Sequence, residues 1–428
     1  MVGKWHVTKV TTAETEDQKY NWPLQRGFDR YYGIINGASS LWDPNSLTRD
    51  NTRITIKNDP EYKPAEKYHF TDAISDNAVR YIKENEQGKP FFMYVAYTAA
   101  HWPMHVREKD IAAYKGVYDN GYTPHREASL TRAKKLGVVK ADAELSEQVG
   151  DWDAVEDKEW EARCMEVYAA MVTQMDRGIG DMIQALKATG QLDNTLVLYF
   201  QDNGGCPEKC GRNEKGPRVE RAANPQFPPI PDDVVHYTAS RPKQTRDGWI
   251  IRRGHVMPGP DDTYIGYGRN WANVSNTSFR EYKAHIYEGG ISTPLIAHWP
   301  NGISDKNAIR KKQSLHVIDL MPTCLELAGA SYPAELKGKP ITPMAGESFV
   351  ATLKEDAEIK RDALYFEHSK RNAMRSGDWK IVGEKILHKK LGPSGWELYN
   401  IANDRSEMHN LAAEYPERVQ EMHAKYMT

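Results

Sequence analysis

Two apolar runs of the sequence are each followed by polar side chains that could bind a ligand or catalyse a reaction. His101 comes after the run at 91–97, and Asp202 and Asn203 come after the run at 195–200. Ligands of open α/β sheets bind beyond the carboxyl ends of the strands, so these side chains are expected to converge. Adjacent Asp and Asn residues offer two hard oxygen ligands, which suit Ca²⁺ or Mg²⁺. A plain turn is the competing interpretation, because Asp-Asn-Gly-Gly is also an ideal turn sequence.

Cationic side chains lie in two further segments. Lys4 and His6 are two positions apart, so in an extended segment both point to one face and could donate to the same anion. Lys283 lies shortly before Gly289 and Gly290, and the paired glycines indicate a close approach of two backbones. The competing interpretations are a solvated lysine with an internally bonded histidine, and an ordinary loop.

The residues give no nucleophile. No Gly-x-Ser-x-Gly elbow and no glycine-rich phosphate loop occurs in the 428 residues. Cys206 and Cys210 are four positions apart, but no matching pair of ligands nearby in the sequence completes a zinc site.

The elements that would position these residues alternate between helix and strand. Apolar residues recur at helical spacing over 72–86, over 168–186 with Gly190 as the expected cap, and from about 317 to 330. The runs at 91–97 and 195–200 are apolar almost throughout, which is typical of strands buried on both faces, and 293–299 resembles them. Segments 107–160 and 206–280 show little periodicity and are expected to form surface helix and loops.

The end of the chain has a different pattern. Short strands are expected at 363–369, 372–376, 378–384 and 396–400, and a final amphipathic helix at 412–427. Consecutive strands predict a small antiparallel sheet, so we expect a large α/β domain at 1–345 and an α+β subdomain at 346–428.

Composition excludes several classes of protein. The chain carries 57 basic and 59 acidic residues and a net charge of -2, which argues against a globally basic nucleic-acid binder. Four cysteines are too few for a disulfide scaffold, and no apolar run approaches the length of a membrane span. Nothing in the sequence indicates the oligomeric state.

Four ordered motifs resemble the type I sulfatase family, which shares the fold of alkaline phosphatase. They are Gly3-Lys4-Trp5-His6, Thr98-Ala99-Ala100-His101-Trp102-Pro103, Asp202-Asn203-Gly204-Gly205, and Lys283 with Glu288-Gly289-Gly290-Ile291-Ser292-Thr293-Pro294. The resemblance extends over nearly the whole chain. It implies a large, mainly parallel central sheet flanked by helices, and hydrolysis of an aryl or carbohydrate sulfate ester.

The resemblance also assigns roles to the residues singled out above. Asp202 and Asn203 would bind the metal, Ca²⁺ in the first place. Lys283 would hold the sulfate oxygens, and His101 would protonate the leaving oxygen. Lys4 would bridge the nucleophile and the sulfate, and His6 would hydrogen-bond the formylglycine hydrate that serves as nucleophile.

The chain departs from the family at one point. Sulfatases carry an Asp-Asp pair on their first strand and a Cys-x-Pro-Ser-Arg motif, or its serine variant, whose first residue becomes formylglycine. Neither precedes Lys4 here, and the cysteine motif occurs nowhere in the chain. We therefore expect a sulfatase that lacks its first segment, with a signal peptide and a periplasmic or secreted location belonging to the longer form. The alternatives are an inactive paralogue that binds sulfated glycans and a phosphodiesterase-like relative.

A basic cluster lies within the aperiodic segment 206–280. Its members are Arg246, Arg252, Arg253 and His255. The cluster either contacts a sulfated glycan or forms a solvated face. Trp102 likewise either stacks on a ring of the substrate or packs against the protein.

Overall fold

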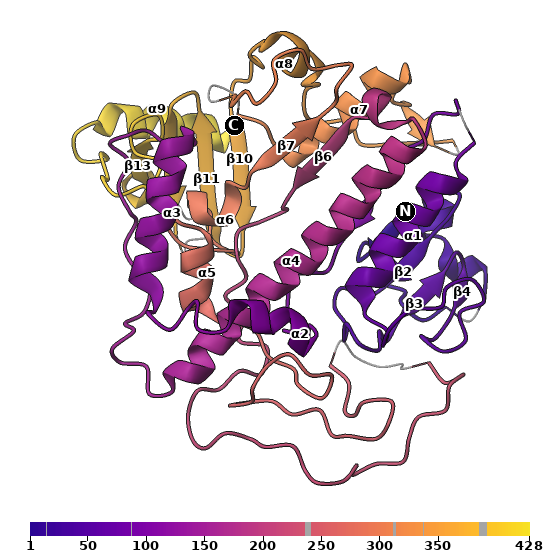
Figure 1. The fold of residues 1–428 in the computed structure, drawn as a ribbon. Coiled ribbons are helices and arrows are strands. Elements are labelled where there is room, and N and C mark those ends of the chain that lie inside the picture. The colour runs from indigo at the N-terminus through magenta and orange to yellow at the C-terminus, as the bar shows by residue number, and fades with distance from the viewer. Residues whose placement is uncertain (14, 87, 236–240, 311–313, 337, 385–391) are drawn as a thin grey trace. The chain divides into compact units, whose positions relative to one another are not determined.

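The computed structural model describes residues 1–428 except 14, 87, 236–240, 311–313, 337 and 385–391 (Figure 1). Its contacts divide the chain into two compact units. Unit 1 comprises Met1–Pro124, Gly150–Gln191 and Cys206–Ala272, and unit 2 comprises His125–Val149, Leu192–Gly205 and Asn273–Thr428.

Unit 1 is built on a five-stranded mixed sheet. Its strands are β1 (Val2–Lys4), β2 (Tyr32–Ile34), β3 (Leu47–Arg49), β4 (Thr52–Arg53) and β5 (Val95–Ala96), in the order β4-β3-β2-β1-β5. β1 is parallel to both β2 and β5, whereas β3 runs antiparallel to β2 and to β4. The carboxyl ends of β1 and β5 therefore lie at the same edge of the sheet.

Two glycines allow the parallel strands to approach. A Cβ at Gly3 would lie 2.0 Å from the backbone oxygen of Ala96, and a Cβ at Gly33 would lie 1.7 Å from the oxygen of Gly3. Gly3 also has φ +104, a conformation that L side chains rarely adopt. Both positions therefore require glycine.

Two long helices of unit 1 pack against each other. They are α1 (Phe70–Glu84) and α4 (Lys158–Ala188), and α2 (Glu108–Ile111) also contacts α4. The helices predicted at 72–86 and 168–186 are confirmed, although α4 begins ten residues earlier. Gly190 has φ +69 and ends α4 as predicted.

The prediction of two strands buried on both faces is wrong for the described structure. Only Val95 and Ala96 of the run at 91–97 form a strand, and Phe92 and Tyr94 are 67% and 45% exposed. β5 lies at the edge of the sheet, where it pairs with β1. In unit 2, β6 (Val197–Phe200) is half-buried along its whole length and pairs antiparallel with β7 (Leu295–His298).

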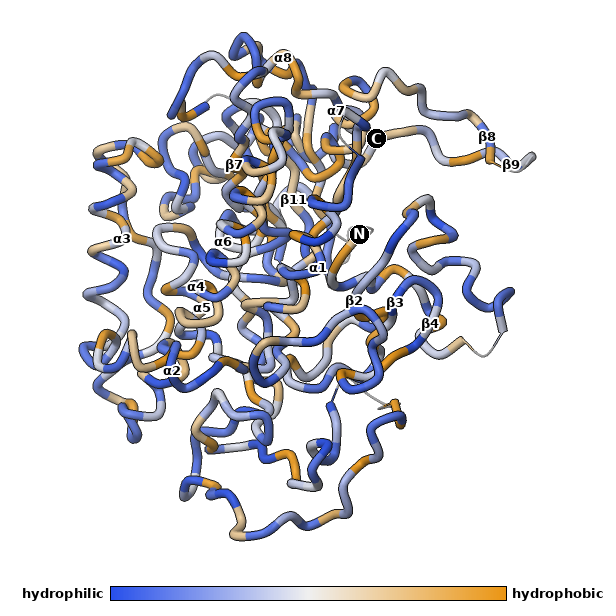
Figure 2. Tube along the Cα trace, turned by 45° about the vertical axis from the view of Figure 1, so that its right-hand side comes forward, coloured by the Kyte–Doolittle hydropathy of each residue, from blue (hydrophilic) through white to orange (hydrophobic). Residues whose placement is uncertain are grey.

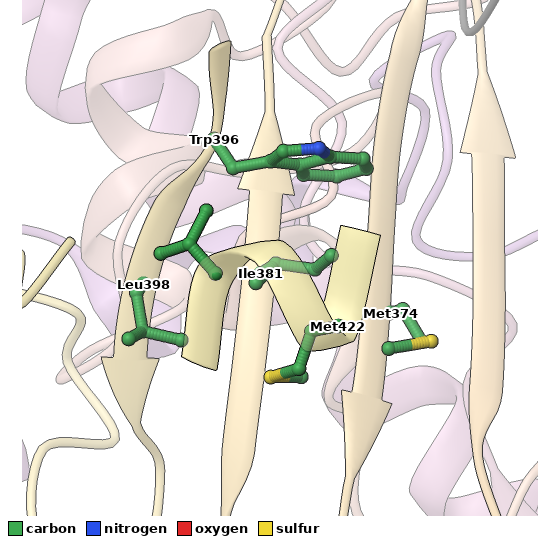
Figure 3. Packing of buried hydrophobic residues seen from close by; sticks show 6 residues of the cluster. Met374, Ile381, Trp396, Leu398 and Met422 are labelled. Atoms are coloured by element: carbon green, nitrogen blue, oxygen red, sulfur yellow. The ribbon is translucent and has the colours of Figure 1, made fainter. Parts of the chain in front are cut away.

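The small antiparallel sheet of unit 2 confirms the prediction for the end of the chain. Its strands are β10 (Leu364–His368), β11 (Arg371–Ser376), β12 (Trp379–Gly383) and β13 (Glu397–Asn400), in sequential order. The final helix, α9 (Pro416–Met427), packs on one face through Val419 and Met422, against a cluster that includes Met374, Ile381, Trp396 and Leu398 (Figure 3).

The other face of this sheet is also covered. Neighbouring residues in the strands point to opposite faces, so Ala373, Val382 and Tyr399 pack against Ile286 and Tyr287 instead. Tyr287 immediately precedes α6 (Glu288–Ile291), so the sheet supports the segment that carries the paired glycines.

The remaining elements are short or connect the others. They are α3 (Tyr122–Leu136), α5 (Arg269–Ser275), α7 (Leu320–Ala328), α8 (Val350–Glu355), β8 (Glu335–Leu336) and β9 (Lys339–Pro340). In the described part of 206–268 the chain forms no helix or named strand, and Figure 2 shows this long loop as mostly hydrophilic with scattered hydrophobic residues. No helix among the described residues is long and apolar enough to span a membrane.

Candidate active site

Lys4 and His6 lie at the carboxyl end of β1. Lys4 is the last residue of the strand, and the backbone amide of His6 still donates to the carbonyl of Ile35 at 3.2 Å. His6 has φ +54, so the extended segment ends before it, and strand alternation does not decide where its side chain points. Gly37 lies against the ring instead: a Cβ there would be 2.1 Å from Nε2 of His6.

His101 follows β5 at the same edge of the sheet. Its Nδ1 lies 3.0 Å from the backbone oxygen of Trp102, and a carbonyl oxygen can only accept. Nδ1 therefore carries a proton. Unit 1 thus brings Lys4, His6 and His101 to the ends of two neighbouring parallel strands.

Asp202 and Asn203 follow β6 in unit 2, as predicted for the end of a strand. Asp202 is exposed, and Nδ2 of Asn203 donates to the carbonyl of Gly204 at 2.8 Å. That hydrogen bond uses the amide nitrogen and leaves the amide oxygen as the atom that can bind a cation. A carboxylate and an amide oxygen fit Ca²⁺, and they provide part of the six to eight oxygens that this ion takes.

Backbone hydrogen bonds join this loop to the segment of Lys283. The amide of Gly204 donates to the carbonyl of Gly290 at 3.1 Å, and the amide of Lys283 donates to the carbonyl of Gly205 at 3.1 Å. A Cβ at Gly204 would lie 1.8 Å from the oxygen of Gly289, which confirms the predicted close approach. The structure therefore brings Asp202, Asn203 and Lys283 together within unit 2.

Asn276 is a positioning residue that the sequence did not reveal. Its Oδ1 accepts from the amide of Gly205 at 2.9 Å, and its Nδ2 donates to the carbonyl of Glu281 at 3.1 Å. It thus bonds both the loop after β6 and the segment before Lys283. The sequence marks Asn276 as the first residue of an Asn-Thr-Ser glycosylation sequon, which does not indicate this positioning role.

A buried cluster of charged residues includes Glu288, the first residue of α6. Lys380 in β12 is fully buried, and its Nζ lies 3.0 Å from Oε1 of Glu288 and 2.8 Å from Oε1 of Glu407. Arg405 also contacts Glu288, and Glu407 accepts from the backbone amide of Glu288 at 2.6 Å. The first residue of α6 is therefore anchored to the antiparallel sheet.

The pKa values of the two carboxylates in this cluster are shifted in opposite directions. Burial raises the pKa of Glu407 to about 7, with Glu288 adding to the rise and Lys380 opposing it. Burial also acts to raise the pKa of Glu288, but Lys380 and Arg405 outweigh it and lower the value to about 2. Glu288 is thus the permanent anion of the cluster.

The basic cluster of the long loop is largely paired inside unit 1. Arg246 contacts Asp43, Arg252 contacts Asp262 and His255 contacts Asp157, at 3.0, 2.9 and 3.1 Å. Trp102 packs against Cys210, Ile251 and Tyr264. The contacts of Trp102 favour packing against the protein, whereas the paired side chains of Arg246, Arg252 and His255 do not form the solvated face that was one of the two alternatives.

Comparison with known proteins decides the family. Residues 1–330 match the sulfatase family model, and residues 280–427 match the C-terminal region of N-sulphoglucosamine sulphohydrolase. The chain belongs to the sulfatase family. It is therefore related to the type I sulfatases of the alkaline phosphatase superfamily, as its motifs predicted.

Individual relatives agree with this assignment. The chain is 28% identical to an uncharacterized sulfatase of Schizosaccharomyces pombe, over 99% of the chain and 72% of that protein. It is 29% identical to an arylsulfatase of Klebsiella aerogenes, over 82% of the chain and 69% of the relative. The crystal structure of Ps i-CgsB in complex with k-i-k-neocarrahexaose matches with a TM-score of 0.59 at 20% identity, over 98% of this chain and 68% of that one. That structural likeness confirms the fold.

Proposed function

We propose that this sulfatase hydrolyses an aryl or carbohydrate sulfate ester. The observation that carries the proposal is the arrangement within each unit: Lys4, His6 and His101 share one sheet edge, while Lys283 is bonded to the loop of Asp202 and Asn203. Sulfate transfer spreads negative charge over the non-bridging oxygens, and fixed cations stabilise that charge.

Each side chain then has a defined task. Lys283 would bind the sulfate oxygens, and Lys4 would neutralise charge between the sulfate and the nucleophile. His101 would deliver a proton to the leaving oxygen, and His6 would hydrogen-bond the nucleophile. The backbone bonds to Gly205 and Ile35 described above hold the chain segments of Lys283 and His6 in place.

The metal and the nucleophile complete the proposal. Asp202 and Asn203 would bind Ca²⁺, with Mg²⁺ as the alternative, and the ion would supply a Lewis acid that polarises the sulfate. The nucleophile would be a formylglycine. Because the 428 residues carry no Cys-x-Pro-Ser-Arg sequence or serine variant, we propose that this chain alone turns over sulfate esters negligibly.

Two classes of sulfate ester are supported by the relatives. The arylsulfatase relative supports an aryl sulfate, and the oligosaccharide complex of Ps i-CgsB supports a sulfated glycan. We propose a periplasmic or secreted location, which follows from the family resemblance alone.

A direct test compares this chain with the same chain preceded by a segment that carries the Asp-Asp pair and Cys-x-Pro-Ser-Arg. Both are assayed with a chromogenic aryl sulfate while calcium is titrated. We expect turnover only in the extended protein, and equal turnover in both would refute the assignment of the nucleophile. Ester binding without turnover in the extended protein would favour the glycan-binding paralogue, and turnover of a phosphodiester instead would favour the phosphodiesterase-like relative.

Variants of the extended protein test the individual roles. Lys283→Ala and His101→Gln are expected to lower kcat/KM at least about 100-fold, the size of effect that removing one transition-state donor has. Lys306→Ala and His298→Gln remove an exposed lysine and an exposed histidine as matched controls, and should leave the rate unchanged. Equal losses in variants and controls would contradict the site.

A further inference from the structure

Three potential metal ligands come together in unit 1. The side chains of His101, Cys206 and Glu208 each offer one ligand atom, and these atoms all lie within 4.8 Å of one another. More than one hundred positions separate His101 from the other two in the sequence. In the sequence, Cys206 and Cys210 alone do not complete a metal site. In the folded chain, a histidine and a carboxylate lie beside Cys206.

Trp102 orients two of the three ligands. Its backbone oxygen accepts from Nδ1 of His101, so a metal would bind this ring through Nε2. Its indole Nε1 donates to Oε2 of Glu208 at 2.7 Å, which holds the carboxylate in place. Metal-binding histidines and carboxylates are usually held by such outer hydrogen bonds.

The ring of Trp102 is held in place by buried residues. The ring packs against Cys210, Ile251 and Tyr264, and Tyr264 is fully buried. Burial raises the pKa of the Cys210 thiol to about 12, which keeps it protonated beside the trio. Cys206 is less buried than Cys210.

We propose that His101, Cys206 and Glu208 form a binding site for a thiophilic divalent metal, with Zn²⁺ as the fitting ion. An imidazole nitrogen, a thiolate and a carboxylate are the three ligand types that zinc takes in proteins, and a water molecule would complete a tetrahedral shell. Calcium and magnesium prefer oxygen ligands alone, so this site differs in chemistry from the pair Asp202 and Asn203. Binding releases the proton of the Cys206 thiol to solvent.

The site has a consequence that rests on the proposed function. His101 cannot give its Nε2 to a metal and to the leaving oxygen of a sulfate ester at the same time. Zinc bound here would therefore block the ester site, and a bound ester would weaken metal binding.

Cobalt(II) provides the test, because a thiolate ligand gives cobalt an intense charge-transfer absorption in the near ultraviolet. The chelator-treated, reduced chain is titrated with Co²⁺ and then with Zn²⁺. We expect one Co²⁺ per chain, a thiolate band, and its loss when Zn²⁺ displaces the cobalt. The band should vanish in Cys206→Ser, and Glu208→Gln and His101→Gln should weaken binding at least about tenfold.

Cys324→Ser is the matched control, because Cys324 is also half-buried but lies in unit 2. This variant should keep the band, and an unchanged band in Cys206→Ser would overturn the proposal. Alkylation by iodoacetamide provides a second measurement that needs no variant: Zn²⁺ should protect Cys206 and leave Cys324 reactive. Equal labelling of Cys206 with and without Zn²⁺ would equally overturn it.

Competition separates this proposal from the proposed function. An excess of an aryl sulfate is expected to raise the Co²⁺ concentration needed for half-saturation. If the thiolate band depends on Cys206 but the ester has no effect, the metal site stands and the role of His101 in ester binding is wrong.

Discussion

Replacing Lys380 by methionine should strongly destabilise unit 2. Methionine has nearly the length of the lysine stem but leaves Glu288 and Glu407 buried without the ammonium group that lies within 3.0 Å of both. Removing one partner of a buried ion pair costs about 3–5 kcal/mol, because the remaining charge stays desolvated. We expect the free energy of unfolding to fall by that amount at pH 8.

The loss should depend on pH. Glu407 has a pKa of about 7, so it is largely protonated at pH 5 and only Glu288 then remains charged, beside Arg405. The penalty of the variant at pH 5 should therefore be clearly smaller than at pH 8. Urea unfolding at the two pH values measures both numbers.

Lys425→Met is the control, since Lys425 pairs with Asp362 at a site where the carboxylate is 84% exposed. Exposed pairs contribute at most about 1 kcal/mol. Hydrogen exchange of the peptide 371–383 should locate the loss in β11 and β12. A change below about 1 kcal/mol for Lys380→Met at pH 8, or one that is equal at both pH values, would refute the reasoning.

Three further outcomes follow from the same structure. The pKa of Glu407 in the folded protein is about 7, above its ordinary value of 4.5. Its contribution to the free energy of unfolding is therefore complete below pH 4.5 and is lost as the pH rises through about 7. Glu407→Gln should flatten this decline, as measured by urea unfolding. Burial lowers the pKa of His69 to about 3 and that of His105 to about 4, so stability should fall as pH drops from 6.5 towards 4, and His105→Gln should reduce the slope. Gly3→Ala should cost more than Gly27→Ala in thermal unfolding, because both have φ near +100 but only Gly3 lacks room for a Cβ; equal costs would show that backbone strain alone matters.

The parts of the fold that could be predicted are those that residues close together in the sequence determine. The ends of the four strands of the antiparallel sheet agree with the prediction within one residue, because the turns between the strands and the alternation within them are both local signals. The helix around Met171 and Met175 was equally clear from its spacing. The motifs located the loops of the site for the same reason.

Burial was harder to predict because it depends on which layer covers a strand. An apolar run such as 91–97 indicates that a strand can be buried, but it does not show whether another layer covers that strand. Phe92, which lies within this run, is exposed in the structure. Lys380 is the reverse case, because lysines are rarely buried, yet two carboxylates distant in the sequence make its burial possible. Asn276 and the trio of His101, Cys206 and Glu208 depend on similar long-range contacts, which no local spacing encodes.

The antiparallel sheet is best understood as the support of the loop that carries Asp202. Lys380 in β12 holds Glu288 at the start of α6, the carbonyl of Gly290 in the same helix accepts from Gly204, and Gly204 follows Asn203 directly. Since a carboxylate as buried as Glu288 is stable only while it is paired, a change in the sheet that displaces Lys380 also frees the backbone that positions the candidate metal ligands. This chain of contacts links a sheet that contributes no side chain to the proposed chemistry to the loop of Asp202 and Asn203.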